Sequence, residues 1–291
     1  MNATDLLALL LAAGLGLAGG SFVNVAARRL PILLARRWRN EALATLHIEP
    51  KTTPPFNLAR PRSHCPSCNA PIRVRHNVPV VGWLLLRGRC ADCGTSIPAR
   101  YPLVELAGLA VALATTAVWG FTALALLHSV FLLALLTAAL IDCDTRLLPD
   151  EITLPLLWLG LGCAWTFPER PALPDAAIGA ATGYLVLWGI YHAFRLVTGK
   201  EGMGHGDFKM LAALGAWFGW QALPAIVLIA SLTGLAFALA RRLRHGPPPT
   251  GDPMAAAMAF GPFLAIGGCV TLFLHDWIVH ATLFRGTLLA P

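Results

Sequence analysis

Long apolar runs with few charges recur along the whole chain, and they constrain its fold more than any other feature. They lie at 6–26, 103–119, 121–141, 152–167, 176–197, 208–220, 222–240 and 258–280. About 20 residues of helix, at about 1.5 Å each, cross a hydrocarbon core of about 30 Å. Only 13% of the residues are charged, against about 25% in soluble domains, which excludes a water-soluble globule and a disordered chain. The sequence therefore predicts an all-α polytopic membrane protein with about eight transmembrane helices.

The first and sixth runs need separate arguments. Residues 1–5 contain no positive side chain, and the basic cluster follows run 6–26, which is the reverse of a secretory signal peptide. We therefore expect an uncleaved first transmembrane helix at 1–27 with its N-terminus outside. Run 208–220 gives only about 20 Å of helix, so we expect either a tilted span or a partly buried or re-entrant helix.

Positive charge is concentrated in one segment between the first two runs. The chain has a net charge of +7, yet residues 28–100 hold thirteen Lys and Arg residues against Glu41, Glu49 and Asp92. Basic loops of membrane proteins stay in the cytoplasm, which places this segment there and leaves 101–291 as the helical membrane domain. Because topology accounts for the charge, we expect the lipid bilayer and not nucleic acid as a partner.

Four of the seven cysteines form two CxxC pairs within this basic segment. Cys65 and Cys68 are separated from Cys90 and Cys93 by 21 residues, which is close to the spacing of paired zinc knuckles. Two such turns present four thiolates to one ion and leave no position for water, so the zinc would be structural. We expect a cytoplasmic zinc-ribbon-like module at 28–100. Disulfides, which a cytoplasmic location disfavours, and free thiols are the alternatives.

Carboxylates gather where the third run ends and the fourth begins. Asp142 and Asp144 follow the third run, and Asp142 lies near the negative end of a helix dipole, where an acid is disfavoured. Asp150 and Glu151 follow Pro149 and fit the first turn of the next helix, where acids complement the dipole. Helix stability therefore accounts for the second pair of acids better than for Asp142.

Asp207 ends a glycine-rich turn that begins at Gly199 and contains Glu201. An Asp before an apolar helix is a common N-cap, and this structural interpretation stands beside a functional one. When the runs are threaded through the membrane alternately, Asp142 and Asp207 fall at the same cytoplasmic edge. Two carboxyls facing each other across a water molecule cannot both ionise, so one protonates while the other activates the water. Such a pair would catalyse aspartic peptide hydrolysis.

Short motifs follow one another along nearly the whole chain. They are Gly20-Ser21-Phe22-Val23-Asn24-Val25, Arg29-Leu30-Pro31, the double CxxC, Gly88-Arg89-Cys90, Tyr101-Pro102-Leu103-Val104-Glu105, Asp142 to Asp150, Glu201-Gly202-Met203-Gly204-His205-Gly206-Asp207 and Phe260-Gly261-Pro262-Phe263. In this order they resemble the bacterial type IV prepilin peptidases of pilus assembly and type II secretion. The resemblance implies that Asp142 and Asp207 are the catalytic pair. It also implies removal of a basic leader from prepilins and pseudopilins, after a glycine, at the cytoplasmic face of the inner membrane.

The family resemblance implies a second activity as well. Members of this family N-methylate the newly exposed residue, usually phenylalanine, with S-adenosylmethionine as the donor. The sequence identifies no methyl-donor-binding residue, so this cofactor rests on the resemblance alone. The acids Asp144, Asp150, Glu151 and Glu201 share the edge of the catalytic pair. They are candidate docking residues for a basic leader.

Two other classes of protein share some of these features. An ion- or proton-coupled transporter also places carboxylates in glycine-interrupted helices, but near the bilayer midplane and not at one edge. A membrane scaffold with a zinc ribbon would need no carboxylate pair. The leading hypothesis is therefore an intramembrane aspartic endopeptidase.

Overall fold

The computed structural model describes residues 2–49, 54–167, 171–200, 203–246 and 258–287. Within these ranges the regular structure is helical, with two isolated β-bridges besides. The chain divides into two units, Met1–Thr137 and Ala138–Pro291. The division falls inside one helix, α4 (Ala123–Thr145).

Each of the eight predicted apolar runs lies largely within a helix. These helices are α1 (Ala3–Thr45), α3 (Arg100–Trp119), α4, α5 (Asp150–Thr166), α6 (Leu173–Thr198), α7 (His205–Phe218), α8 (Leu223–His245) and α10 (Gly261–Thr287). Among the described residues, five segments are long and apolar enough to cross a membrane: Ala3–Thr45, Arg100–Trp119, Ala123–Thr145, Leu173–Thr198 and Trp220–Arg244. The helical fold with several candidate spans is confirmed, and eight crossings stays a prediction.

In the N-terminal unit, α1 packs along α3 through glycines. A Cβ added to Gly16 would lie 2.6 Å from the carbonyl oxygen of Gly108, and one added to Gly20 would lie 2.7 Å from the carbonyl oxygen of Val104. Only glycine lets two backbones approach this closely, and the spacing of Gly16 and Gly20 is that of the GxxxG motif of membrane helices. Large apolar side chains on α1 are exposed instead, as on a surface that faces lipid: Leu6, Leu7, Leu10, Leu11 and Leu15.

Helix α1 is longer than the apolar run that predicted it. The run ends at residue 26, whereas the helix continues through Pro31 to Thr45. A helix of 43 residues is about 65 Å long, so about half of it extends beyond a hydrocarbon layer of about 30 Å. The basic segment therefore begins as a helical continuation of the first span.

The rest of the basic segment, residues 54–99, contains little regular structure. Its described helices are the short η1 (Val74–His76) and α2 (Val81–Leu85). Arg29 on α1 donates hydrogen bonds of 3.0, 3.1 and 2.8 Å to the carbonyl oxygens of Asn57, Leu58 and Pro61. These three bonds attach the segment to the extension of α1.

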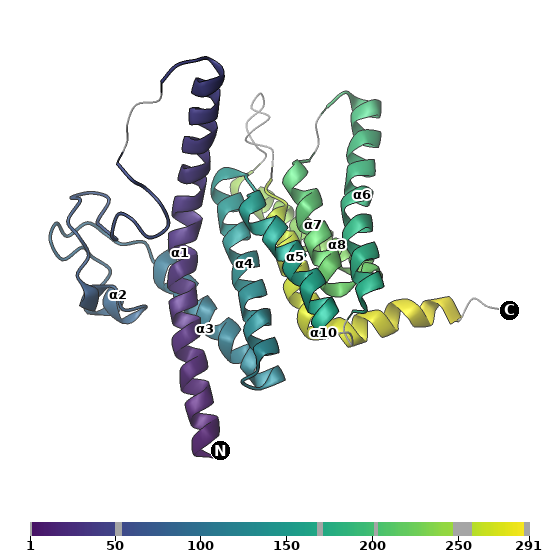
Figure 1. The fold of residues 1–291 in the computed structure, drawn as a ribbon, viewed down its shortest axis with the longest axis horizontal. Coiled ribbons are helices and arrows are strands. Elements are labelled where there is room, and N and C mark those ends of the chain that lie inside the picture. The colour runs from purple at the N-terminus through teal and green to yellow at the C-terminus, as the bar shows by residue number, and fades with distance from the viewer. Residues whose placement is uncertain (1, 50–53, 168–170, 201–202, 247–257, 288–291) are drawn as a thin grey trace. The chain divides into compact units, whose positions relative to one another are not determined.

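In the C-terminal unit, α7 is covered by its neighbours. It packs against α5, α6 and α10, and every residue from Met210 to Phe218 is buried (Figure 1). The contact with α6 again uses glycine, because a Cβ added to Gly183 would lie 2.6 Å from the carbonyl oxygen of Leu211. Most of run 208–220 therefore lies in a helix of 14 residues that is covered by protein, and its crossing of the membrane stays a prediction.

Candidate active site and metal centre

Asp142 lies in the last turn of α4, as the sequence predicts, and only 4% of its surface is exposed. Its Oδ2 atom accepts a hydrogen bond of 2.9 Å from the backbone N–H of Gly261, the first residue of α10. The N-terminus of a helix has unpaired N–H groups and a positive dipole end, both of which favour an anion. The start of α10 therefore holds a carboxylate that the end of α4 alone would disfavour.

Asp207 lies in the first turn of α7, but it is not the N-cap. The helix begins at His205 and its N-cap is Gly204, so the N-cap interpretation is wrong. The side chain of Asp207 is 7% exposed, and its Oδ1 atom is buried with no hydrogen-bond partner among the described residues. Leaving a buried polar atom unpaired costs about 1–3 kcal/mol. Helix stability therefore does not explain this orientation, whereas a polar group supplied by substrate or water would.

The two carboxylates belong to one cluster of close contacts. Leu148, in the connection between α4 and α5, lies against two glycines beside the pair. A Cβ added to Gly206 would lie 2.6 Å from Cβ of Leu148, and one added to Gly261 would lie 2.7 Å from Oδ2 of Asp142. Glycine at these two positions therefore leaves room for Leu148 and for the carboxylate of Asp142.

This arrangement can perform acid–base chemistry on a bound water molecule. Two interacting carboxyls in a buried place cannot both ionise cheaply, which favours the state that carries one proton. In that state the ionised group can accept a proton from water while its partner donates one to a carbonyl oxygen. The sequence singled out both carboxylates, whose catalytic role stays a prediction, but not the hydrogen bond from Gly261 to Asp142. The one sequence feature that could have indicated Gly261 is its position in the Phe260 to Phe263 motif.

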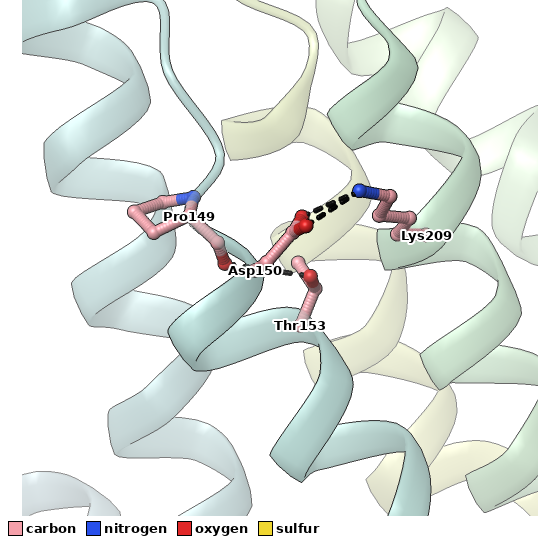
Figure 2. A network of polar contacts seen from close by, with 4 residues as sticks. All are labelled: Pro149, Asp150, Thr153 and Lys209. Atoms are coloured by element: carbon pink, nitrogen blue, oxygen red, sulfur yellow. Dashed lines mark hydrogen bonds and ion pairs between the residues drawn. The ribbon is translucent and has the colours of Figure 1, made fainter. Parts of the chain in front are cut away.

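A second contact joins α5 and α7 beside the carboxylate pair. Figure 2 shows Asp150 and Lys209 pointing toward each other, with Nζ of Lys209 2.7 Å from both carboxylate oxygens. Asp150 lies in the first turn of α5, as predicted, where the hydroxyl of Thr153 donates to the carbonyl oxygen of Pro149 at 3.4 Å. A half-exposed ion pair contributes about 1 kcal/mol or less. Its main effect is to join the first turns of two helices, and sequence reasoning did not single out Lys209.

The four candidate docking acids differ in their surroundings. Asp144 and Glu151 are exposed near the facing ends of α4 and α5. Asp150 is exposed as well, but its charge is matched by Lys209. Glu201 lies outside the described residues. A docking role for these acids stays a prediction.

The four cysteines of the two CxxC pairs come together in the N-terminal unit. All four Sγ atoms lie within 4.8 Å of one another. The distance is 3.8 Å from Cys65 to Cys93 and 4.0 Å from Cys68 to Cys90. Tetrahedral Zn–S bonds of about 2.3 Å place sulfurs about 3.8 Å apart, so the spacing fits a shared metal ion. No disulfide joins these cysteines.

The electrostatics of one cysteine also favour metal binding. Hydrogen bonding to the hydroxyl and the backbone of Thr95 lowers the pKa of Cys93 to about 6, whereas burial and the three neighbouring thiols raise the pKa of Cys68 to about 12. A metal ion binds the thiolate and not the thiol, so a lowered pKa assists ligation at neutral pH. The cluster can therefore hold a metal ion, and its four-sulfur donor set is the one that zinc takes in structural sites.

Comparison with known proteins identifies the family. Residues 129–239 match the model of the type IV leader peptidase family, and residues 15–121 match that of the bacterial peptidase A24 N-terminal domain. The prepilin leader peptidase/N-methyltransferase of Aeromonas hydrophila is 49% identical over 268 residues, which cover 90% of this chain and 89% of that protein. The protein of the same name from Stutzerimonas stutzeri is 46% identical, with 92% and 91% covered. No solved structure matches significantly. The chain therefore belongs to the type IV leader peptidase family.

Proposed function

We propose that this enzyme removes the basic leader from type IV prepilins and pseudopilins and then N-methylates the new N-terminal residue. The observation that carries the peptidase activity is the buried pair of Asp142 and Asp207, which interact at the ends of two helices. The family and the names of its relatives support the same activity. Cleavage follows a glycine at the cytoplasmic face of the bacterial inner membrane.

In the proposed mechanism, a water molecule held between the carboxyls attacks the scissile carbonyl carbon. Asp142 is the base, because the N–H of Gly261 stabilises its ionised form. Asp207 carries the proton and donates it to the carbonyl oxygen, since its Oδ1 atom has no donor among the described residues. Collapse of the tetrahedral intermediate breaks the C–N bond, and the proton taken up by Asp142 passes to the leaving amine. No covalent enzyme intermediate forms.

Zinc is the metal proposed for the four-cysteine cluster. Cys65, Cys68, Cys90 and Cys93 would hold it in a closed shell of four thiolates, which leaves it no catalytic position. The segment around the cluster has little regular structure. The ion would therefore supply much of the stability that an apolar core supplies elsewhere.

The basic leader docks beside the catalytic pair through opposite charge. Asp144 and Glu151 are the exposed acids at this edge, and attraction between exposed charges raises the rate of encounter. Asp150 belongs to the same proposal and forms an ion pair with Lys209. Glu201 is also proposed as a docking residue, because it lies in the glycine-rich turn that precedes Asp207 in the sequence.

For the second activity, bound S-adenosylmethionine would supply an activated methyl group to the new N-terminal amine. The amine must therefore arrive neutral and unprotected, which requires that cleavage comes first.

Mass spectrometry of a prepilin incubated with the purified enzyme and S-adenosylmethionine tests both activities. We expect loss of the leader and gain of one methyl group with the wild type, and neither change with Asp207→Asn. A pre-cleaved pilin offered to the same variant should still be methylated, which shows that the variant is folded. If the wild type leaves the leader in place, the peptidase proposal fails.

A further inference from the structure

A cavity of about 480 Å³ opens in the N-terminal unit, between α1, the start of α3 and the four-cysteine segment. Helix α1 contributes Asn24 and Arg28 to its lining, and the first turns of α3 contribute Tyr101 and Glu105. Trp83 lines it from α2. All the residues that line this cavity belong to the N-terminal unit. Its volume lies within the range of about 300–1,000 Å³ that is usual for small-molecule sites.

Hydrogen bonds fix the walls of this cavity. The side-chain amide of Asn24 donates to the carbonyl oxygen of Tyr101 at 3.0 Å, and the indole N–H of Trp83 donates to the carbonyl oxygen of Ile97 at 3.0 Å. Gly88 has a φ of +67°, and a Cβ at this position would lie 2.8 Å from the Trp83 ring. The ring can therefore take its place only because residue 88 is glycine. The site is preorganised, which reduces the entropic cost of binding a ligand.

The polar lining carries both signs of charge. Arg28 is a cation whose Nη1 donates to the Tyr101 hydroxyl at 3.1 Å. Oε2 of Glu105 accepts a hydrogen bond of 2.7 Å from the backbone N–H of Val80. A ligand with only an acyl chain would have no group to pair with these two charged side chains. A zwitterionic ligand would have a partner for each. The aromatic rings of Trp83 and Tyr101 can stack on a planar base and attract a cation.

We propose that this cavity binds the methyl donor, S-adenosylmethionine. The assignment rests on the proposed methyltransferase activity and gives it a site. The donor combines a planar purine, a sulfonium cation and an amino-acid group, and the lining offers a partner for each. Arg28 takes its carboxylate, Glu105 takes positive charge, and the aromatic side chains hold the base. Methylation therefore uses residues other than the carboxylate pair, and the two activities are separable by mutation.

Isothermal titration of the purified full-length enzyme with S-adenosylhomocysteine, the unreactive product, tests this assignment. The variants are Arg28→Gln and Glu105→Gln, since glutamine removes each charge and, at position 105, keeps an oxygen for the N–H of Val80. Loss of a charged contact should weaken binding about tenfold or more. Arg62→Gln and Glu41→Gln are the matched controls, because both positions are exposed and neither lines the cavity. The controls should bind as the wild type does.

Leader cleavage is measured on the same samples and should be retained, which shows that the variants are folded. If the wild type cleaves but neither binds S-adenosylhomocysteine nor methylates, the methyltransferase proposal itself fails. If the wild type methylates and the cavity variants bind with unchanged Kd, the cavity assignment fails alone. Ultraviolet crosslinking of radiolabelled S-adenosylmethionine to the wild type, mapped by mass spectrometry, gives a readout independent of folding. The label should fall within residues 21–105, and labelling confined to the C-terminal unit would overturn the assignment.

Discussion

The two units position their reactive side chains in opposite ways. In the N-terminal unit the four cysteines lie on short turns outside the long helices, and two of them are exposed. In the C-terminal unit Asp142 and Asp207 are buried at the ends of helices. A thiolate cluster gains stability from the metal that it binds, so it needs little surrounding structure. A carboxylate pair has no such ligand, and its geometry depends on the helices that hold it.

The largest effect should follow from removing one carboxylate. Asp142→Asn or Asp207→Asn eliminates the exchange of a proton between acid and base, so leader cleavage should fall by about 10³-fold or more. The zinc content should not change, because the cysteines belong to the other unit. Mass spectrometry measures the fall in the cleavage rate, and elemental analysis measures whether the zinc content is unchanged. Wild-type rates in either variant would be incompatible with the assigned mechanism.

The next effect should come from the metal cluster. Cys68→Ser removes one of four ligands, so the zinc content should fall to background and the segment 54–99 should become sensitive to limited proteolysis. Cleavage of the leader should fall far less than in the Asp variants, because the carboxylate pair is held by α4, α7 and α10. Cys163→Ser, outside the cluster, is the control. Full zinc occupancy in Cys68→Ser would disprove the four-thiolate site.

A smaller effect should follow from changing the group that holds Asp142. In Gly261→Ala the added Cβ would lie 2.7 Å from Oδ2 of Asp142 and 3.1 Å from Leu148, so the carboxylate must move. Misplacement of a catalytic group by about 1 Å costs about 10²-fold in rate, and we expect a loss of that order in kcat. Gly189→Ala is the control, because its Cβ would meet nothing within 4 Å. The pH profile of kcat should also shift in Gly261→Ala, whereas an unchanged profile would assign Gly261 to folding alone.

The exposed acids should affect binding more than chemistry. Neutralising both Asp144 and Glu151, by Asn and Gln, should raise KM several-fold and lower kcat less, because long-range attraction acts on encounter. The effect should shrink at high salt, which screens exposed charges. Asp150→Asn is the comparison variant, and its KM should change less because it removes one charge and the double variant removes two. Unchanged KM in the double variant would remove the docking proposal.

The smallest effect should belong to the ion pair between α5 and α7. A double-mutant cycle of Asp150→Asn and Lys209→Gln should give a coupling free energy of unfolding of about 1 kcal/mol or less, since both side chains are partly exposed. Denaturation in detergent with each single variant and the double variant measures it. A coupling of several kcal/mol would show that this pair, and not the packing of α7, holds the site together.

Features that depend on near neighbours in the chain could be predicted from the sequence. The distance between Cys65 and Cys68 in the chain already presents two sulfurs to one ion, and Pro149 already indicates that Asp150 begins a helix. Each of the eight apolar runs is likewise defined by residues that follow one another in the chain. Each of these predictions rests on a few adjacent residues, which is why the helices and the cysteine cluster could be read before the fold was known.

Features that join distant segments could not be predicted in this way. The hydrogen bond from Gly261 to Asp142 spans 119 positions, and the contact from Lys209 to Asp150 spans 59. The extension of α1 was missed for another reason. Beyond residue 26 the charge-poor run is interrupted by Arg28, Arg29, Arg36, Arg37 and Arg39, although Arg, Leu and Ala all favour helix formation. The pattern of apolar residues therefore predicts the part of a helix that contacts lipid, and it does not predict the part that extends into water.

The dependence of Asp142 on α10 has a consequence for biogenesis. A ribosome makes the chain from its N-terminus, and segments fold in that order as they emerge. Asp142 is synthesised before Gly261, so the nascent chain contains both aspartates for some time without the backbone group that bonds to one of them. The polar surroundings of Asp142 are therefore complete only when the chain is almost fully synthesised.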